Sequence, residues 1–283
     1  MEMLSLLKWP LVAVLILPWM LVYLGLHVVQ RGIIFVDLAL AQVAALGTCV
    51  AIWVGHDVHG WQSYAWSVAF TLVGAIVFSL TRSKNPRVPQ EALIGIVYVV
   101  AAAAGILILS HSAEGKEELQ RSMIGELLVV SPNEIWQTFG LYALVAGVHI
   151  AFRSRFLAIS FDTEKAAAGG MAVRWWDFLF YVMFGFVVTS FVHIGGVLLV
   201  FSYLIVPAVC ATYLAHGLLA RLIVGWGIAT VASVIGLVVT VQVDLPIGAA
   251  IVCLLGLSLL AVGVLVRLGP ARFRKTVGRA PSV

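Results

Sequence analysis

Long apolar runs alternate with short polar connections along nearly the whole chain. Each run is close to the ~20 residues that an α-helix needs to cross a ~30 Å hydrocarbon core. The runs lie at about 10–29, 34–54, 62–81, 91–110, 134–153, 174–190, 194–214, 218–240 and 245–266. Only a short bend separates 174–190 from 194–214, so eight or nine spans are expected. Because the runs are continuous rather than alternating, they predict helices and not a β-barrel: an all-α polytopic transmembrane bundle.

Composition supports a membrane location. Hydrophobic residues make up 62% of the 283 residues and charged residues only 11%, whereas soluble domains carry about a quarter charged residues. A single soluble core cannot bury this much apolar surface, so lipid is the natural solvent. We expect one membrane domain over 1–268 and a basic tail over 269–283. Although the net charge is +4, the basic residues cluster at the ends of apolar runs, which does not indicate binding to nucleic acid.

Charge also predicts the orientation. Fourteen of the 17 Lys and Arg residues lie in alternate connections or the C-terminal tail, and Lys8, Lys116 and Arg121 lie on the opposite side. Cytoplasmic connections carry the excess of basic residues. With nine spans, the N-terminus would therefore be outside and the C-terminus inside.

Two ionisable residues lie in apolar surroundings. A carboxylate within a span, such as Asp37, is a functional-site hypothesis by default, because burying a charge is costly. The alternative is that Asp37 pairs with Arg31, His27 or a neighbouring helix. His193 lies near the outer end of a later span, where it is either a ligand or a structural histidine.

The two long connections contain helix-capping patterns. The outer one ends in Ser131-Pro132-Asn133-Glu134, which predicts a capping box at the start of the next span. The inner one contains Phe161-Asp162-Thr163-Glu164-Lys165 followed by Gly169-Gly170. There Asp162 can cap a short cytoplasmic helix that the glycines end.

No enzymatic motif is present in the sequence. It has no GxxxxGK[ST] phosphate-binding loop, so the chain should not hydrolyse a nucleotide itself. HExxH and GxSxG are also missing. We therefore expect a transport subunit rather than an enzyme.

Several segments, taken in order, carry a family resemblance. They are Arg31 to Gly47, Glu91-Ala-Leu-Ile-Gly95-Ile, Ile124-Gly125-Glu126-Leu-Leu-Val-Val-Ser131, Phe161-Asp162-Thr-Glu164-Lys-Ala166, Gly196-Val-Leu-Leu with Leu204-Ile-Val-Pro207-Ala208, and Asp244-Leu245-Pro246-Ile-Gly248-Ala-Ala-Ile251. In this order and spacing the chain resembles the ABC-3 family, the membrane permease subunits of ABC importers for zinc, manganese and iron(II). The resemblance extends from about Val28 to Val266.

The chain departs from the family pattern around Asp37. The family motif R-x-S-L-x-G-D-A-L-S-H-A-x-x-P-G has a histidine four residues after its aspartate, one turn further on the same helix face. Here that position is Ala41, and Gln42 lies about 140° around the helix from Asp37. Val36 and Ala45 replace the family's glycine and proline. The fold and general role therefore transfer better than the metal-site chemistry.

The resemblance implies an ATP-driven importer of a divalent transition metal, with zinc expected first and manganese or iron(II) next. It implies a second permease copy, a separate ATPase subunit, an extracytoplasmic metal-binding protein, and the plasma (inner) membrane of a prokaryote. No cofactor is expected to stay bound, because the metal is the transported substrate. The candidate residues are Asp37 and His193 for metal; Glu91, Asp244 and Gln42 for the pathway or gate; and Phe161, Asp162, Glu164 and Gly170 for ATPase coupling.

Other interpretations remain open for several of these residues. Glu91 opens a helix, where the macrodipole favours a carboxylate, and Asp244 can cap the last helix. The short helix after Asp162 can be a plain surface helix. Alternative functions are an ABC permease for a metal chelate or cobalamin-like substrate, and a secondary cation carrier. An intramembrane enzyme or assembly scaffold is the remaining alternative.

Overall fold

The computed structural model describes residues 2–58, 60–81, 89–110, 123–125 and 127–268. All regular structure in these ranges is helical, which confirms the predicted all-α bundle. The helices are α1 (Glu2–Ile16), α2 (Pro18–Arg31), α3 (Val36–Trp53), α4 (Trp61–Leu80), α5 (Gln90–Leu109), the 3-10 helix η1 (Leu127–Val129), α7 (Pro132–Ala151), α8 (Arg153–Phe161), α9 (Thr163–Ala168), α10 (Val173–Leu214), α11 (Leu218–Val243) and α12 (Ile247–Leu268).

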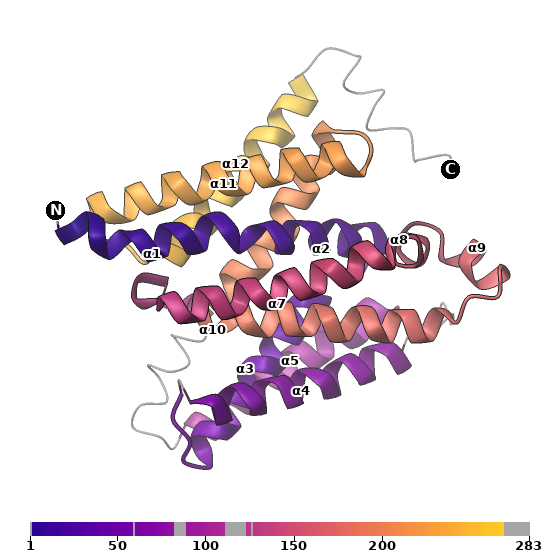
Figure 1. Cartoon of the computed structure of the whole chain (residues 1–283), viewed down its shortest axis with the longest axis horizontal. Helices are drawn as coiled ribbons and strands as arrows, with labels where there is room; N and C mark the ends of the chain where they lie inside the picture. Colours follow the sequence, from indigo (N-terminus) through magenta and orange to yellow (C-terminus); the bar gives the residue numbers. More distant parts are fainter. Residues whose placement is uncertain (1, 59, 82–88, 111–122, 126, 269–283) are drawn as a thin grey trace.

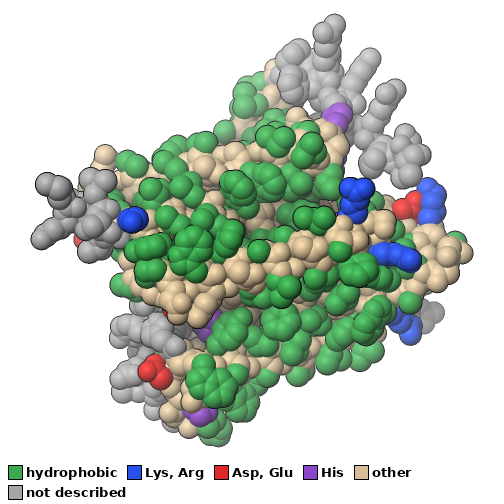
Figure 2. Space-filling model, in the orientation of Figure 1, with side chains coloured by type: hydrophobic (Ala, Val, Ile, Leu, Met, Phe, Trp, Pro, Cys, Tyr) green, Lys and Arg blue, Asp and Glu red, His purple; other side chains and the backbone are tan. Residues whose placement is uncertain are grey.

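Helix α10 is the central element of the bundle. It packs against α2, α3, α4, α11 and α12 (Figure 1). Its large buried side chains include Phe180, Phe184, Phe191 and Tyr203. In contrast, α5 buries only Ile94, Ala101, Gly105 and Leu109. Apolar side chains therefore cover both the interior and the outer faces of the bundle (Figure 2), as expected for a protein dissolved in lipid.

A break at Gly196 divides α10 into two limbs. A straight 42-residue helix would be about 63 Å long, twice the thickness of a hydrocarbon core. Gly196 adopts φ 73° and ψ 165°, which is not helical, and Figure 1 shows the chain turning back towards the end at which α10 began. Seven described helices are long and apolar enough to span a membrane, or eight if bent α7–α8 forms one span. Counting the limbs of α10 separately gives the predicted eight or nine.

Close backbone contacts surround this break. A Cβ atom on Gly196 would overlap backbone atoms of Met123 to Gly125, and one on Gly125 would overlap those of Gly195 and Gly196. A Cβ atom on Gly248, at the start of α12, would lie 2.5 Å from the Ile124 carbonyl oxygen. Three of the segments that carry the family resemblance therefore meet at one end of the bundle, where only glycine allows the backbones to approach.

Basic side chains gather at the opposite end. Figure 2 shows most of the visible Lys and Arg side chains near α8 and α9. Exposed basic residues of this region are Arg153, Arg155, Lys165 and Arg174. This distribution agrees with a cytoplasmic location for α8 and α9. The predicted tail over 269–283 lies outside the described residues.

Candidate metal pathway and coupling region

Asp37 lies in the first turn of α3 and is fully buried. The start of a helix favours a negative charge, because its free N–H groups point towards it. Neither carboxylate oxygen bonds to another side chain in the described part of the molecule. Its charge is therefore not balanced by the fold in the way that a buried ion pair would be.

The partners considered for Asp37 are engaged elsewhere. Arg31 donates from Nη1 to Asp177 Oδ1 at 3.2 Å, and from Nε to the Ser160 hydroxyl at 2.9 Å. The Nδ1 atom of His27 lies 2.9 Å from the same hydroxyl. Neither Arg31 nor His27 therefore bonds to the Asp37 carboxylate.

Helix α3 contains no histidine, and Gln42 lies about 140° around the helix from Asp37. Ala41, at the family's histidine position, is fully buried and offers no ligand. Gln42 is buried, and its amide oxygen has no hydrogen-bond partner among the described residues. No group of three or more His, Cys, Asp or Glu side chains suited to a metal ion occurs in the described ranges. A complete metal site would therefore need donors from elsewhere.

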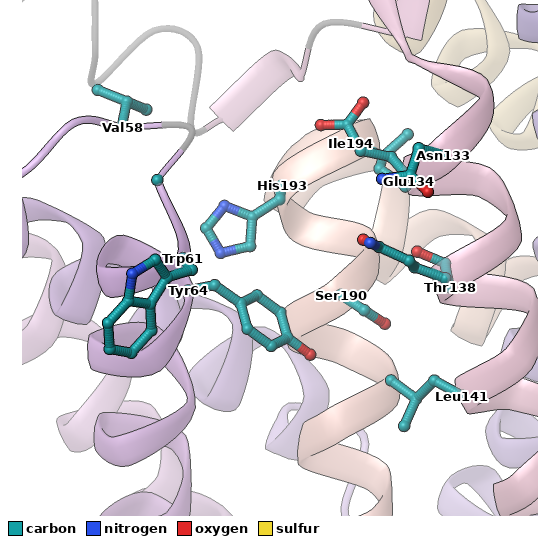
Figure 3. A pocket seen from close by; sticks show the side chains of 12 residues that line it. Val58, Trp61, Tyr64, Asn133, Glu134, Thr138, Leu141, Ser190, His193 and Ile194 are labelled. Carbon is teal, nitrogen blue, oxygen red and sulfur yellow. The ribbon is translucent and has the colours of Figure 1, made fainter.

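A cavity of about 510 Å³ opens at the other end of the bundle (Figure 3). His193 of α10 lies there, with its ring 5.8 Å from the ring of Tyr64 on α4. Figure 3 shows Glu134 and Thr138 of α7 on the facing wall. The remaining lining residues are Val58, Gly60, Trp61, Asn133, Gln137, Leu141, Ser190 and Ile194.

Sequence reasoning found His193 but missed most of this cavity. Glu134, Gln137, Thr138 and Leu141 follow one another at intervals of three, one and three residues, which places them on one face of α7. That partly polar stripe within an apolar span was the available signal. Its facing partners on α4 and α10 lie far away in the sequence, so the cavity itself could not be derived.

Asp37 and His193 do not come together within one chain. Asp177, whose partner Arg31 ends α2 just before α3, lies 16 residues before His193 on the unbroken part of α10. At 1.5 Å per residue, this separation is about 24 Å along the helix. Asp37 therefore lies towards the α8–α9 end, whereas His193 lies at the cavity.

The coupling segment has the predicted local structure. Helix α7 begins with the expected capping box between Ser131 and Glu134, and bends by 81° into α8. Asp162 Oδ1 accepts a hydrogen bond from the Lys165 backbone N–H at 3.2 Å and so caps α9. The chain leaves α9 through Gly170, whose φ is 78°.

An ion pair lies at the start of α9. The Lys165 side chain lies 2.7 Å from Asp162 Oδ2. This hydrogen bond holds the pKa of the Asp162 carboxyl below its ordinary value. Glu164 is exposed, as is the Phe161 side chain, so α9 presents a mixed polar and aromatic surface outside the bundle. Its docking onto an ATPase stays a prediction.

The remaining pathway candidates lie at helix ends. Glu91 is in the first turn of α5, as expected from its sequence context. Asp244 ends α11 in the left-handed conformation, with φ 56°, and its N–H donates to the Thr240 carbonyl oxygen. Because α12 begins only at Ile247, Asp244 is the C-cap of α11, and the expectation that it caps the last helix is corrected.

Comparison with known proteins identifies the family. The sequence model of the ABC 3 transport family matches residues 3–266. The chain belongs to this family. This match confirms the resemblance to the ABC-3 family that the sequence segments indicated.

Individual relatives are distant but cover most of the chain. The manganese transport system membrane protein MntC of Listeria innocua is 26% identical over 81% of this chain and 79% of its own length. The manganese import system permease protein ScaB of Streptococcus gordonii is 25% identical over 81% and 80%. In the structure of PsaBC from Streptococcus pneumoniae in complex with Fab, one chain has a TM-score of 0.77, with 22% identity and coverage of 91% and 90%. This last likeness shows the shared fold.

Proposed function

We propose that this chain is the permease subunit of an ATP-driven importer for a divalent transition metal ion, with manganese as the first candidate. The observation that carries the proposal is Asp37, a fully buried carboxylate without a side-chain partner among the described residues. It lies within the segment Arg31 to Gly47, which resembles a motif of the ABC-3 family. A transported cation supplies the positive charge that the fold does not supply.

The donor atoms favour manganese over zinc. Carboxylate and carbonyl oxygens suit Mn²⁺, whereas imidazole nitrogen suits Zn²⁺. Asp37 offers oxygen, and Ala41 removes the imidazole of the family pattern. The names of the Listeria and Streptococcus relatives also specify manganese. Our ranking therefore changes from the sequence-based expectation of zinc to manganese, with zinc as the next candidate.

The complete importer needs further subunits. We infer a second copy of this chain, because by family resemblance one chain is half of a translocator and its described residues hold no group of three or more His, Cys, Asp or Glu suited to a metal. A separate ATPase would dock on α8–α9, and an extracytoplasmic metal-binding protein would deliver the ion at the end that holds the His193 cavity. The assembly would lie in the inner membrane of a prokaryote. It would hold no resident cofactor, since the metal passes through as substrate.

We infer alternating access, the mechanism that the family resemblance implies. The cavity at His193 and the carboxylate of Asp37 lie at different depths. An ion entering from outside would pass the cavity and then reach Asp37. ATP binding and hydrolysis would move α9 and change the side from which Asp37 is accessible.

The deciding experiment is uptake into vesicles that contain the assembled complex. Mn²⁺ and Zn²⁺ are supplied separately, with and without ATP, to wild type, Asp37→Asn and His193→Ala. We expect ATP-dependent Mn²⁺ uptake that Asp37→Asn lowers by at least about tenfold and that His193→Ala also lowers. Asp57→Asn, the same change at an exposed loop residue, is the matched control and should transport normally.

The alternatives give different results in the same assay. Uptake that does not depend on ATP would indicate a secondary carrier. Uptake of a metal only as its chelate, unaffected by Asp37→Asn, would indicate a chelate permease, an alternative that Ala41 at the family's histidine position keeps open. Either result would overturn the proposal.

A further inference from the structure

We propose that a buried cluster transmits movement of α9 to the start of α3 and thereby positions Asp37. The cluster comprises His27 and Arg31 of α2, Ser160 of α8 and Asp177 of α10. None of these residues binds the ion; they are positioning residues. The proposal rests on the proposed function of an ATP-driven importer and goes beyond it by assigning the route of coupling.

The first part of the route is an ion pair that is almost fully buried. The side chains of Arg31 and Asp177 are 3% and 0% exposed, and Nη1 and Oδ1 lie 3.2 Å apart. The Arg31 guanidinium also lies over the Phe180 ring, 3.8 Å from its centroid. Because a guanidinium is planar and its donors are fixed in direction, it can bind partners on two helices only when those helices are correctly placed.

Ser160 is the partner that brings α8 into the cluster. Its hydroxyl accepts from Arg31 Nε and also contacts His27 Nδ1, each at 2.9 Å. His27 and Arg31 are four residues apart and lie on one face of α2. Helix α8 buries only Phe156, Ile159 and Ser160. Ser160 is therefore the polar attachment of a short, largely exposed helix.

The cluster is directly connected to α9. Ser160 lies two residues before Asp162, which ends α8 and also caps α9. Asp162 alone separates the two helices, and α8 and α9 contact each other. A force applied to α9 by an ATPase would consequently be felt at Ser160.

The cluster is equally close to Asp37. Arg31 is the last residue of α2, and Gly32 follows it in the left-handed conformation with φ 67°. Helix α3 begins four residues later, at Val36, with Asp37 in its first turn. Displacing the Arg31 side chain would therefore act on a connection of only four residues before reaching Asp37.

If the cluster only stabilised the fold, the hydroxyl of Ser160 would not be required. The pair between Arg31 and Asp177 already joins α2 to α10. The hydroxyl bridge of Ser160 adds α8, which runs into the start of α9 through Asp162. A structural role predicts that stability, ATP hydrolysis and uptake fall together, whereas the coupling role predicts that they separate.

The test is Ser160→Ala in the assembled complex. This change removes the bridge and leaves the pair between Arg31 and Asp177. We expect the melting temperature to fall modestly, because Arg31 Nε loses its buried acceptor, and ATP hydrolysis to remain close to wild type. The number of Mn²⁺ ions moved per ATP should fall by roughly fivefold, the scale of one lost hydrogen bond. Ser160→Thr retains the hydroxyl and should restore the ratio.

Two further variants test the same interpretation. Arg31→Lys keeps the charge opposite Asp177 but loses the Nε donor to Ser160, so it should show the same split. Ser233→Ala is the matched control: it removes a buried hydroxyl that bonds Tyr203 between α10 and α11, without touching α8. Its transport ratio should equal that of wild type.

The outcomes distinguish the two proposals. If the wild-type complex shows no ATP-driven uptake, the proposed function is wrong and this inference falls with it. If wild type transports and Ser160→Ala keeps the wild-type ratio, only the inference is wrong. The same holds if uptake, ATP hydrolysis and melting temperature fall in parallel and Ser160→Thr does not restore them.

Discussion

Two buried aspartates towards the α8–α9 end of the bundle have opposite surroundings. Asp177 is fully buried and pairs with Arg31. Asp37 is also fully buried, yet its carboxylate bonds to no side chain among the described residues. A buried charge is tolerated only when something compensates it. The fold compensates Asp177, whereas Asp37 has the unpaired carboxylate that the proposed cation site requires.

The largest expected effect is on stability at the paired site. Asp177→Asn leaves the Arg31 guanidinium buried opposite a neutral group, and breaking a buried pair in this way costs about 3–5 kcal/mol. We expect a lowered free energy of unfolding, measured by denaturant titration in detergent. Asp37→Asn, the same substitution at the unpaired site, is the matched comparison. Equal losses in both variants would contradict the difference between the two aspartates.

The second effect is on transport at the unpaired site. Asp37→Asn keeps the side-chain volume but removes the charge that would hold a cation. Uptake should fall by at least about tenfold, the effect of 1.4 kcal/mol, while the melting temperature stays unchanged or rises. Asp37→Glu keeps the charge and should retain part of the uptake. A strongly destabilised Asp37→Asn would show instead that the fold relies on this carboxylate.

A change of metal selectivity would test whether the transported ion binds at Asp37. Ala41→His places an imidazole one turn after Asp37, on the same helix face. Because imidazole suits zinc, the ratio of Zn²⁺ to Mn²⁺ uptake should rise by on the order of tenfold, or about 1.4 kcal/mol. Ala39→His introduces the same residue on the other side of α3, at an equally buried position. A similar shift in both variants would rule out a specific site at Asp37.

The smallest effect concerns the exposed pair at α9, where solvent weakens charge interactions. Since Lys165 holds the pKa of Asp162 below its ordinary value, the cap stabilises α9 at pH above the ordinary carboxyl pKa. This contribution is lost as pH falls through the lowered pKa of the folded state. Hydrogen exchange at the Lys165 amide, corrected for intrinsic rate, should therefore accelerate below about pH 4. Asp162→Asn keeps a capping oxygen and should remove this pH dependence.

Local features were predictable because nearby residues determine them. The capping box at Ser131 and the cap at Asp162 depend on residues three positions apart, and both are present. Asp244 shows the limit of this reasoning. Aspartate suits either side of a helix connection, and the backbone entered the left-handed conformation at the end of α11 instead of capping α12.

The sequence by itself determined the helical membrane fold, the capped short helix α9 and the choice of Asp37 as a candidate residue, because apolar run length and capping are local properties. The predicted orientation and the docking of α9 onto an ATPase stay predictions. Only the tertiary structure decided which charges are paired. Arg31 and Asp177 are 146 residues apart, and Asp177 gave no signal as a partner in the sequence. Tertiary packing also separated His193 from Asp37 and formed the cavity around His193. These relations depend on how distant helices pack, which no local pattern encodes.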